Sequence, residues 1–102
     1  MEDAKYLLLA DAALERAAEW LEEFDPDVVD FATTDGVVTI EFPSGTKYIL
    51  NRQRAAYQMW LAAGSEAWHY DWNEESQSWV DHKDGHELFA NLEARVRAKI
   101  AG

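Results

Sequence analysis

The sequence predicts an α+β fold in which two helices pack on one face of a five- to six-stranded antiparallel sheet. Residues 4–24 and 86–100 carry apolar side chains at spacings of three and four, which is typical of amphipathic helices. The residues between them form short alternating segments separated by turn signals, which indicates neighbouring antiparallel strands. The chain has 102 residues, so we expect a single domain over 1–102.

The first predicted helix ends at Asp25-Pro26, because proline disfavours helical backbone in the residue before it. Trp20 lies off the apolar stripe of this helix. The residues of the stripe are Leu7, Ala10, Leu14, Ala17, Leu21 and Phe24.

Five strands are expected after this helix, and a short sixth is the alternative that makes the sheet six-stranded. The five are Val28–Thr33, Val37–Phe42, Lys47–Asn51, Ala56–Ala62 and Trp68–Trp72, and the short sixth is Ser78–Asp81. Asp35-Gly36 is a hairpin signal, Pro43-Ser44-Gly45 turns the chain, and Asp84-Gly85 ends the strands.

Alternation along the strands separates a covered face from a face exposed to water. The covered face is expected to hold Val38, Ile40, Phe42, Tyr48, Leu50, Tyr57, Met59 and Leu61. Gln58 and Trp60 alternate to the open face, whereas Trp68 and Trp72 share the core spacing of Tyr70. In the second helix the apolar side is predicted to be Leu88, Phe89, Leu92, Val96 and Ile100.

The net charge is −11, and it is concentrated in residues 1–30, where ten acids face only Lys5 and Arg16. Such a charge repels nucleic acid and favours cations or a basic protein surface. No apolar run reaches the roughly 20 residues that a membrane helix needs. The acidic start Met1-Glu2-Asp3 is unlike a signal or transit peptide, and the lack of cysteine excludes disulfides and thiolate ligands. We therefore expect a bacterial cytoplasmic protein, with a mature mitochondrial form as the alternative.

A line of acids runs from the first helix into the first strand, and we call it the acidic ridge. Its members are Glu15, Glu19, Glu22, Glu23, Asp25, Asp27 and Asp30. On a helical wheel Asp11 falls within the same arc of about 80° as Glu15, Glu19 and Glu22. A solvated helix face is the simple interpretation. However, only Arg16 relieves the repulsion, and acids at a helix C-terminus are disfavoured by about 0.3–1 kcal/mol each.

A bound cation would remove these costs. Carboxylates are hard ligands that suit Fe²⁺, Fe³⁺, Mn²⁺ and Ca²⁺. Because no chelating loop is visible, the predicted site is exposed, weak and exchangeable, and one hard divalent cation can substitute for another there.

Several motifs along the chain resemble the frataxin family. They are "NRQRAAYQMWLA" (Asn51–Ala62), "WHYDW" (Trp68–Trp72), "SWV" (Ser78–Val80) and "DG" (Asp84-Gly85). The chain length is similar to that of the bacterial branch. The resemblance implies a frataxin-like sandwich and an iron-binding protein that docks on the cysteine desulfurase and scaffold of iron–sulfur cluster assembly. It assigns partner contact to Asn51, Gln53 and Trp60, with Gln58 as their neighbour, and it implies a monomer by default, with iron-dependent oligomers left open.

The histidines give weaker signals. His69 alternates outward beside Asp71, so it is a candidate for a surface site next to Trp60. His82 and His86 straddle Asp84-Gly85 and therefore do not share a helix turn, so a paired-histidine zinc site is not expected there.

Two alternative functions stay open. A ferroxidase would need a fixed site, and the sequence has no Glu-x-x-His pair of the di-iron kind, so we assign no catalytic residue. A metal-independent acidic interaction module would use the charge and Trp60 without iron.

Overall fold

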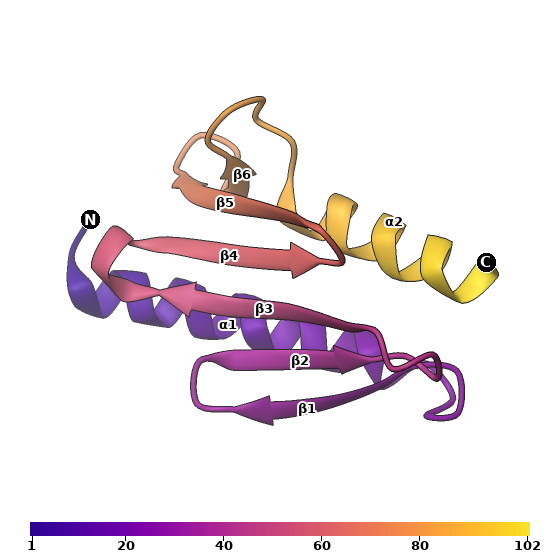
Figure 1. The fold of residues 1–102 in the computed structure, drawn as a ribbon. Helices are drawn as coiled ribbons and strands as arrows, with labels where there is room; N and C mark the ends of the chain where they lie inside the picture. The colour runs from indigo at the N-terminus through magenta and orange to yellow at the C-terminus, as the bar shows by residue number, and fades with distance from the viewer.

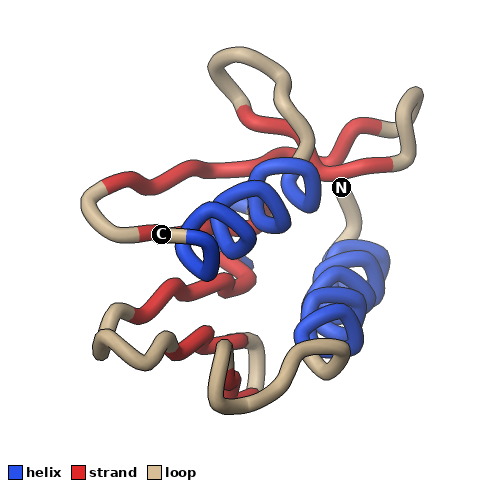
Figure 2. Tube along the Cα trace, turned by 90° about the vertical axis from the view of Figure 1, so that its right-hand side faces the viewer, coloured by secondary structure: helices blue, strands red, loops and turns tan.

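The computed structural model describes residues 1–102 and has two helices on one side of a six-stranded antiparallel sheet (Figures 1 and 2). The α+β prediction is therefore confirmed. The strands lie in the order of the sequence, so each pairs with its chain neighbours. The elements are α1 (Asp3–Leu21), β1 (Asp30–Thr34), β2 (Val37–Glu41), β3 (Lys47–Gln53), the 3₁₀ helix η1 (Arg54–Ala56), β4 (Gln58–Ala63), β5 (Glu66–Asn73), β6 (Ser78–Asp81) and α2 (Leu88–Ala101).

Helix α1 buries a stripe close to the predicted one, but its phase differs at the N-terminal end. Ala10, Leu14, Ala17 and Leu21 are buried as predicted. Leu7 is only partly buried, and Tyr6 is fully buried in its place, together with Ala13. The Tyr6 hydroxyl donates to the carbonyl of Gln58 at 2.7 Å, and this bond anchors the start of α1 on β4.

The helix ends at Leu21 rather than near residue 24. The N–H groups of Glu23 and Phe24 bond to carbonyls three residues back, so the last turn tightens before the chain leaves the helix. Phe24 therefore lies in the turn, where its ring packs against Trp20 at a centroid distance of 5.0 Å.

The covered face of the sheet is buried as the alternation predicts. Seven of its eight predicted residues are buried: Val38, Ile40, Phe42, Tyr48, Leu50, Met59 and Leu61. Tyr57 is partly buried and contacts the Tyr6 ring at 5.3 Å. Tyr70 and Trp79 are buried, whereas Trp68 and Trp72 pack against the core with part of each ring exposed.

Four predicted strand boundaries are wrong by two residues, and one of them is the start of β5, which lies at Glu66 rather than Trp68. β1 begins at Asp30 because residues 25–29 form a turn in which the N–H groups of Val28 and Val29 bond to the Asp25 carbonyl. β3 runs on to Gln53. β4 begins at Gln58, two residues late, because η1 occupies 54–56 and Tyr57 adopts a left-handed backbone with φ 53°.

Helix α2 begins at Leu88, two residues later than predicted. Glu87 caps it, its carboxylate accepting the N–H groups of Phe89 and Ala90 at 2.8 and 2.9 Å. Ile100 is 36% exposed, contrary to the prediction, because the last turn lines a surface hollow beside Val28. Neither helix combines the length and apolarity that crossing a membrane requires.

Candidate functional site

The acidic ridge occupies one continuous stretch from the middle of α1 to the start of β1. Glu15 and Glu19 lie on α1, and Glu22 is the C-terminal cap of that helix. The other four members lie in the turn that follows and at the first residue of β1; they are Glu23, Asp25, Asp27 and Asp30. All seven side chains are exposed.

No member of the ridge has a cationic partner. The ion pairs of the protein all join other residues. Arg16, the one base close to the ridge in sequence, stacks on Phe89 instead, with its Cζ 3.8 Å from the ring centroid. Repulsion within the ridge is therefore not relieved by any ion pair.

Asp11, which the helical wheel groups with the ridge, is neutralised. Its Oδ1 lies 2.5 Å from Arg52 Nη1, and Nη2 of the same guanidinium lies 3.0 Å from Asp35 Oδ1. The hydrogen bond to Asp35, followed by the charge of Asp11, raises the pKa of Arg52. The uncompensated acids consequently begin at Glu15.

Backbone contacts hold two ridge carboxylates in place. Asp25 Oδ1 accepts the N–H of Asp27 at 2.9 Å, and Asp30 Oδ1 accepts the N–H of Phe31 at 2.8 Å. Each uses one oxygen in this way, and the protein offers no hydrogen bond to the other. The turn therefore presents ordered carboxylates with one oxygen free for a cation.

The ridge is a line of ligands rather than a cage. Ligand atoms from three His, Asp or Glu residues lie within 4.8 Å of one another only at Asp81, Asp84 and His86. The ridge carboxylates are therefore available one or two at a time, an arrangement that favours weak binding with water in the remaining coordination positions.

The open face of the sheet holds the four residues predicted to contact partners. Strand register aligns Asn51 with Trp60, and Gln53 with Gln58. Trp60 is only partly exposed, because His69 covers one face of the indole with a centroid distance of 4.2 Å and an interplanar angle of 10°.

Hydrogen bonds fix the orientation of Trp60. Its Nε1 donates to Gln58 Oε1 at 2.9 Å, and Gln58 Nε2 donates to Asp71 Oδ1 at 3.0 Å. The sequence predicted that His69 lies next to Trp60, because both residues alternate outward on adjacent predicted strands. It did not predict that the two rings stack. The structure brings Gln58 and Trp60 together and leaves Asn51 bonded to the carbonyl of Arg52 at 3.1 Å.

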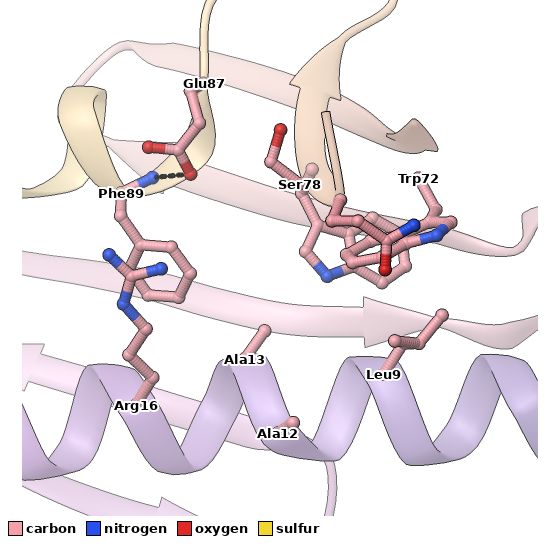
Figure 3. A pocket seen from close by; sticks show the side chains of 10 residues that line it. Leu9, Ala12, Ala13, Arg16, Trp72, Ser78, Glu87 and Phe89 are labelled. Atoms are coloured by element: carbon pink, nitrogen blue, oxygen red, sulfur yellow. Dashed lines mark hydrogen bonds between the residues drawn. The ribbon is translucent and has the colours of Figure 1, made fainter. Parts of the chain in front are cut away.

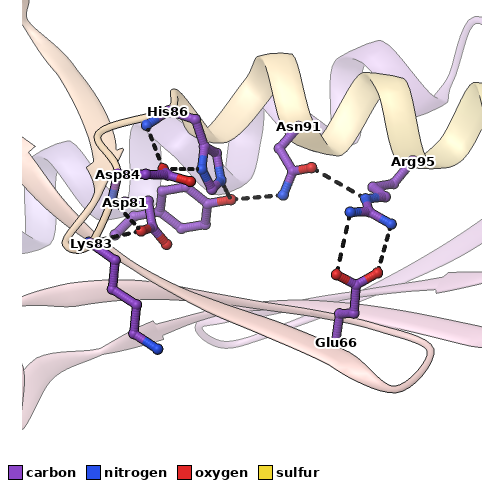
Figure 4. Close-up of polar contacts among 8 residues, drawn as sticks. Glu66, Asp81, Lys83, Asp84, His86, Asn91 and Arg95 are labelled. Carbon is purple, nitrogen blue, oxygen red and sulfur yellow. Dashed lines mark hydrogen bonds and ion pairs between the residues drawn. The ribbon is translucent and has the colours of Figure 1, made fainter.

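A polar network that the sequence did not predict links the loop after β6 to α2 (Figure 4). His86 Nδ1 lies 2.6 Å from Asp84 Oδ1, and its Nε2 lies 2.7 Å from the Tyr70 hydroxyl. Asn91 Nδ2 donates to that hydroxyl at 2.9 Å, and Asn91 Oδ1 accepts from Arg95 Nε at 3.3 Å.

The environment of this network shifts two pKa values. Burial raises the pKa of Tyr70 to about 12. The backbone N–H of His86, followed by its side chain, lowers the pKa of Asp84. Asp81 is buried, and its Oδ1 accepts the N–H groups of Lys83 and Asp84 at 2.8 and 3.1 Å. Both nitrogens of His86 are already hydrogen-bonded, so this network holds the loop after β6 in place and leaves no imidazole nitrogen for a metal.

A small apolar hollow lies between α1, β6 and the start of α2 and has a volume of about 170 Å³ (Figure 3). Leu9 and Ala13 of α1 line one side, and Trp79 and Phe89 line the other. Trp72 Nε1 is buried without a hydrogen-bond acceptor. The lining has no nucleophile paired with a base, so the hollow offers no catalytic constellation.

Comparison with known proteins places the chain among bacterial and eukaryotic relatives. A model of the frataxin-like domain matches residues 1–102. The chain is 35% identical to the iron-sulfur cluster assembly protein CyaY of Psychromonas ingrahamii, over 94% of this chain and 89% of that protein. It is 38% identical to the CyaY of Thioalkalivibrio sulfidiphilus, over 90% and 87% of the two chains.

Solved structures agree with the sequence comparison. Frataxin from Psychromonas ingrahamii superposes with a TM-score of 0.86 at 33% identity, covering 97% of this chain and 91% of that one. Trimeric frataxin from the yeast Saccharomyces cerevisiae, complexed with ferrous iron, superposes with a TM-score of 0.70 at 28% identity, covering 100% and 88%. The sequence motifs, the fold and the relatives all lead to one conclusion: this chain belongs to the frataxin family.

Proposed function

We propose that this protein is an iron-binding adaptor of iron–sulfur cluster assembly in the bacterial cytoplasm. It binds Fe²⁺ and Fe³⁺ weakly and exchangeably on the acidic ridge. The observation that carries the proposal is that all seven ridge acids are exposed and lack any basic partner. Two kinds of relative support it: proteins named for iron–sulfur cluster assembly and a yeast frataxin complexed with ferrous iron.

The ligand chemistry agrees with a carrier. Exposed carboxylates bind hard cations with fast exchange, and a protein that hands on its ion has to release it. Mn²⁺ and Co²⁺ are expected to occupy the same carboxylates. A free oxygen on Asp25 and another on Asp30 provide the ordered ligands at the end of the ridge.

The protein partners in this proposal are the cysteine desulfurase and the scaffold protein. The ridge would meet a basic patch on a partner, and the open sheet face would contribute Asn51, Gln53, Gln58 and Trp60. A tryptophan held between His69 and Gln58 is already ordered before binding, and tryptophan is over-represented among the residues that dominate interface energies. In this proposal the protein is a monomer by default. Whether iron makes it associate into oligomers is a question that the iron titration described below addresses.

The test is a titration of ¹⁵N-labelled protein with Fe²⁺ without oxygen, or with Mn²⁺. Amide signals of residues 15–30 should broaden first. A variant with Glu19→Gln, Glu22→Gln and Glu23→Gln should bind several-fold more weakly. The matched control removes the same charge elsewhere, at Glu2, Glu75 and Glu93, which form no ion pair. Equal losses in the two variants would show that only net charge matters and would overturn the ridge as the site.

Partner binding separates the adaptor from a metal-independent module. Capture of the desulfurase and scaffold should weaken with Trp60→Ala and, separately, with the ridge variant. Capture that survives both the ridge variant and a chelator, but not Trp60→Ala, would favour the module.

A further inference from the structure

His69 of β5 and His82, the residue after β6, lie opposite each other on neighbouring antiparallel strands. The register that pairs Tyr70 with Asp81 places His82 opposite His69 when it is continued by one residue. The N–H of His82 donates to the carbonyl of His69 at 3.2 Å, so the pairing continues there. Residues directly opposite in such a pair project to the same face, with Cβ atoms about 4.5–5.5 Å apart. Both imidazoles therefore lie on the open side of the sheet.

The two imidazole rings line the same hollow. It has a volume of about 390 Å³, and its other lining residues include Lys83 and Asp84. His82 is exposed and His69 is partly exposed. No protein group hydrogen-bonds to a ring nitrogen of either residue, whereas both ring nitrogens of His86 are engaged. The nitrogens of this pair are thus free to accept an ion.

The spacing of the rings suits a shared ion. A zinc–imidazole nitrogen bond is about 2.0–2.1 Å, which puts each ring centre about 3 Å from the metal and two ring centres about 5 Å apart at a tetrahedral angle. The ring centroids of His69 and His82 are 5.7 Å apart, inclined by 61°. A change of side-chain torsion in the exposed His82 is enough to close the remaining difference.

We propose that His69 and His82 form a two-histidine site for a borderline divalent transition-metal ion, with water in the other coordination positions. Zn²⁺, Ni²⁺ and Cu²⁺ belong to this class, because neutral imidazole suits them, whereas carboxylates suit harder ions. The site is therefore distinct from the acidic ridge in both position and selectivity. The net charge of −11 attracts cations to it, and Lys83 opposes them locally.

The ion would act on the surface that holds Trp60. The His69 ring stacks on Trp60, and its centroid lies 5.7 Å from that of His82, so a metal bound to both histidines would fix the imidazole that covers the indole. This inference does not depend on iron binding by the ridge.

The experiment is a Ni²⁺ titration of the intact ¹⁵N-labelled protein in a non-coordinating buffer with excess Mg²⁺. Magnesium competes for carboxylates but not for imidazoles. Amide signals of residues 68–70 and 81–83 should broaden at low Ni²⁺. The variant His82→Gln should bind Ni²⁺ about tenfold or more weakly. Its exposure means that the fold should survive, and a well-dispersed amide spectrum checks this.

The matched control is Lys83→Gln, which alters the neighbouring side chain but keeps both imidazoles, and it should bind Ni²⁺ at least as tightly as the unchanged protein because Lys83 opposes cations there. An unchanged Ni²⁺ affinity in His82→Gln would overturn the proposal, as would broadening confined to residues 15–30. The ridge variant with Glu19→Gln, Glu22→Gln and Glu23→Gln should still bind Ni²⁺ at the histidines. Ni²⁺ binding by the ridge variant would show that the histidine site does not depend on the ridge carboxylates. This conclusion would hold whether or not the ridge binds iron.

Discussion

Trp60 and His69 stack face to face across β4 and β5, with ring centroids 4.2 Å apart and planes inclined by only 10°. They occupy paired positions in the strand register, so the stack is part of the sheet rather than a chance contact of mobile side chains. The edge of the indole is held by Gln58, which accepts the Trp60 Nε1 hydrogen bond and itself donates to Asp71. The open face therefore presents an ordered aromatic surface before any partner arrives.

We expect His69→Ala to weaken partner binding mainly by loosening Trp60. Losing an aromatic pair should cost about 0.5–1.5 kcal/mol of folding free energy, while Trp60→Ala should cost about 2 kcal/mol or more of binding free energy. Calorimetry with the partner complex measures the binding free energy, and urea unfolding measures the folding free energy. Ile49→Ala is the matched control, because Ile49 is 39% exposed on a neighbouring strand. If that control lost as much binding as Trp60→Ala, the stacked pair would have no special role.

Arg52→Gln should destabilise the fold by about 1–3 kcal/mol. Its side chain is only 20% exposed and binds Asp11 of α1 and Asp35 of the β1–β2 hairpin, so the substitution leaves two acids without a cation. Urea unfolding measures the loss.

Lys47→Gln is the comparison, since Lys47 and Glu41 form an exposed pair at 3.8 Å that should contribute about 0–1 kcal/mol. In a double-mutant cycle, Asp11→Asn should cost less in the Arg52→Gln background than in the unchanged protein. Additive effects would show that the ion pair contributes nothing.

The melting temperature should rise with ionic strength. Raising salt from about 0.01 M to about 1 M shortens the Debye length from about 30 Å to about 3 Å and screens the repulsion within the ridge. Divalent cations should raise it further by binding the folded state. Circular dichroism melts check both effects. The ridge variant with Glu19→Gln, Glu22→Gln and Glu23→Gln should melt higher at low salt and respond less to salt, and a ridge variant that melted lower would contradict this reasoning.

Tyr70→Phe should destabilise the protein at neutral pH by about 1–3 kcal/mol, because His86 and Asn91 lose their shared hydroxyl partner. The difference in the free energy of unfolding between the unchanged protein and Tyr70→Phe should become smaller at high pH. Burial raises the pKa of Tyr70 to about 12 from the ordinary value of 10.0, so the unfolded chain loses the phenol proton first. Stability is therefore full below pH 10 and falls between pH 10 and about 12, by at most about 1.4 kcal/mol per pH unit. Urea unfolding of both proteins across this window makes the comparison, and a difference that stayed constant would refute it.

Local patterns determined how well each element was predicted. The two-residue period of β4 correctly separated Met59 and Leu61 from Gln58 and Trp60. The start of that strand was missed because a left-handed Tyr57, with φ 53°, is rare for a residue other than glycine. Leu7 was placed in the stripe of the first helix, but the buried stripe runs through Tyr6, Ala10, Ala13 and Ala17, and the hydrogen bond from Tyr6 to Gln58 holds it in that phase.

The site was predictable only where it is continuous in sequence. The ridge runs along one stretch, so its members could be named from the chain alone. Asp11 was misjudged because Arg52, its partner, lies 41 positions away and comes close only through the packing of α1 on β3. The His69–His82 pair and the Tyr70–His86 contact likewise depend on the register of β5 with β6, which the sequence does not state.

Strand β1 forms an outer edge of the sheet, with its second row of N–H and C=O groups left unpaired by any further strand. Such an edge can recruit the strand of another molecule. Asp30 stands at its first position, and Asp25 and Asp27 lie in the turn just before it, so one end of the edge carries acids that no base pairs with. Mutual repulsion therefore discourages two copies from joining edge to edge, and a cation that quenches this charge would also lift the barrier to self-assembly.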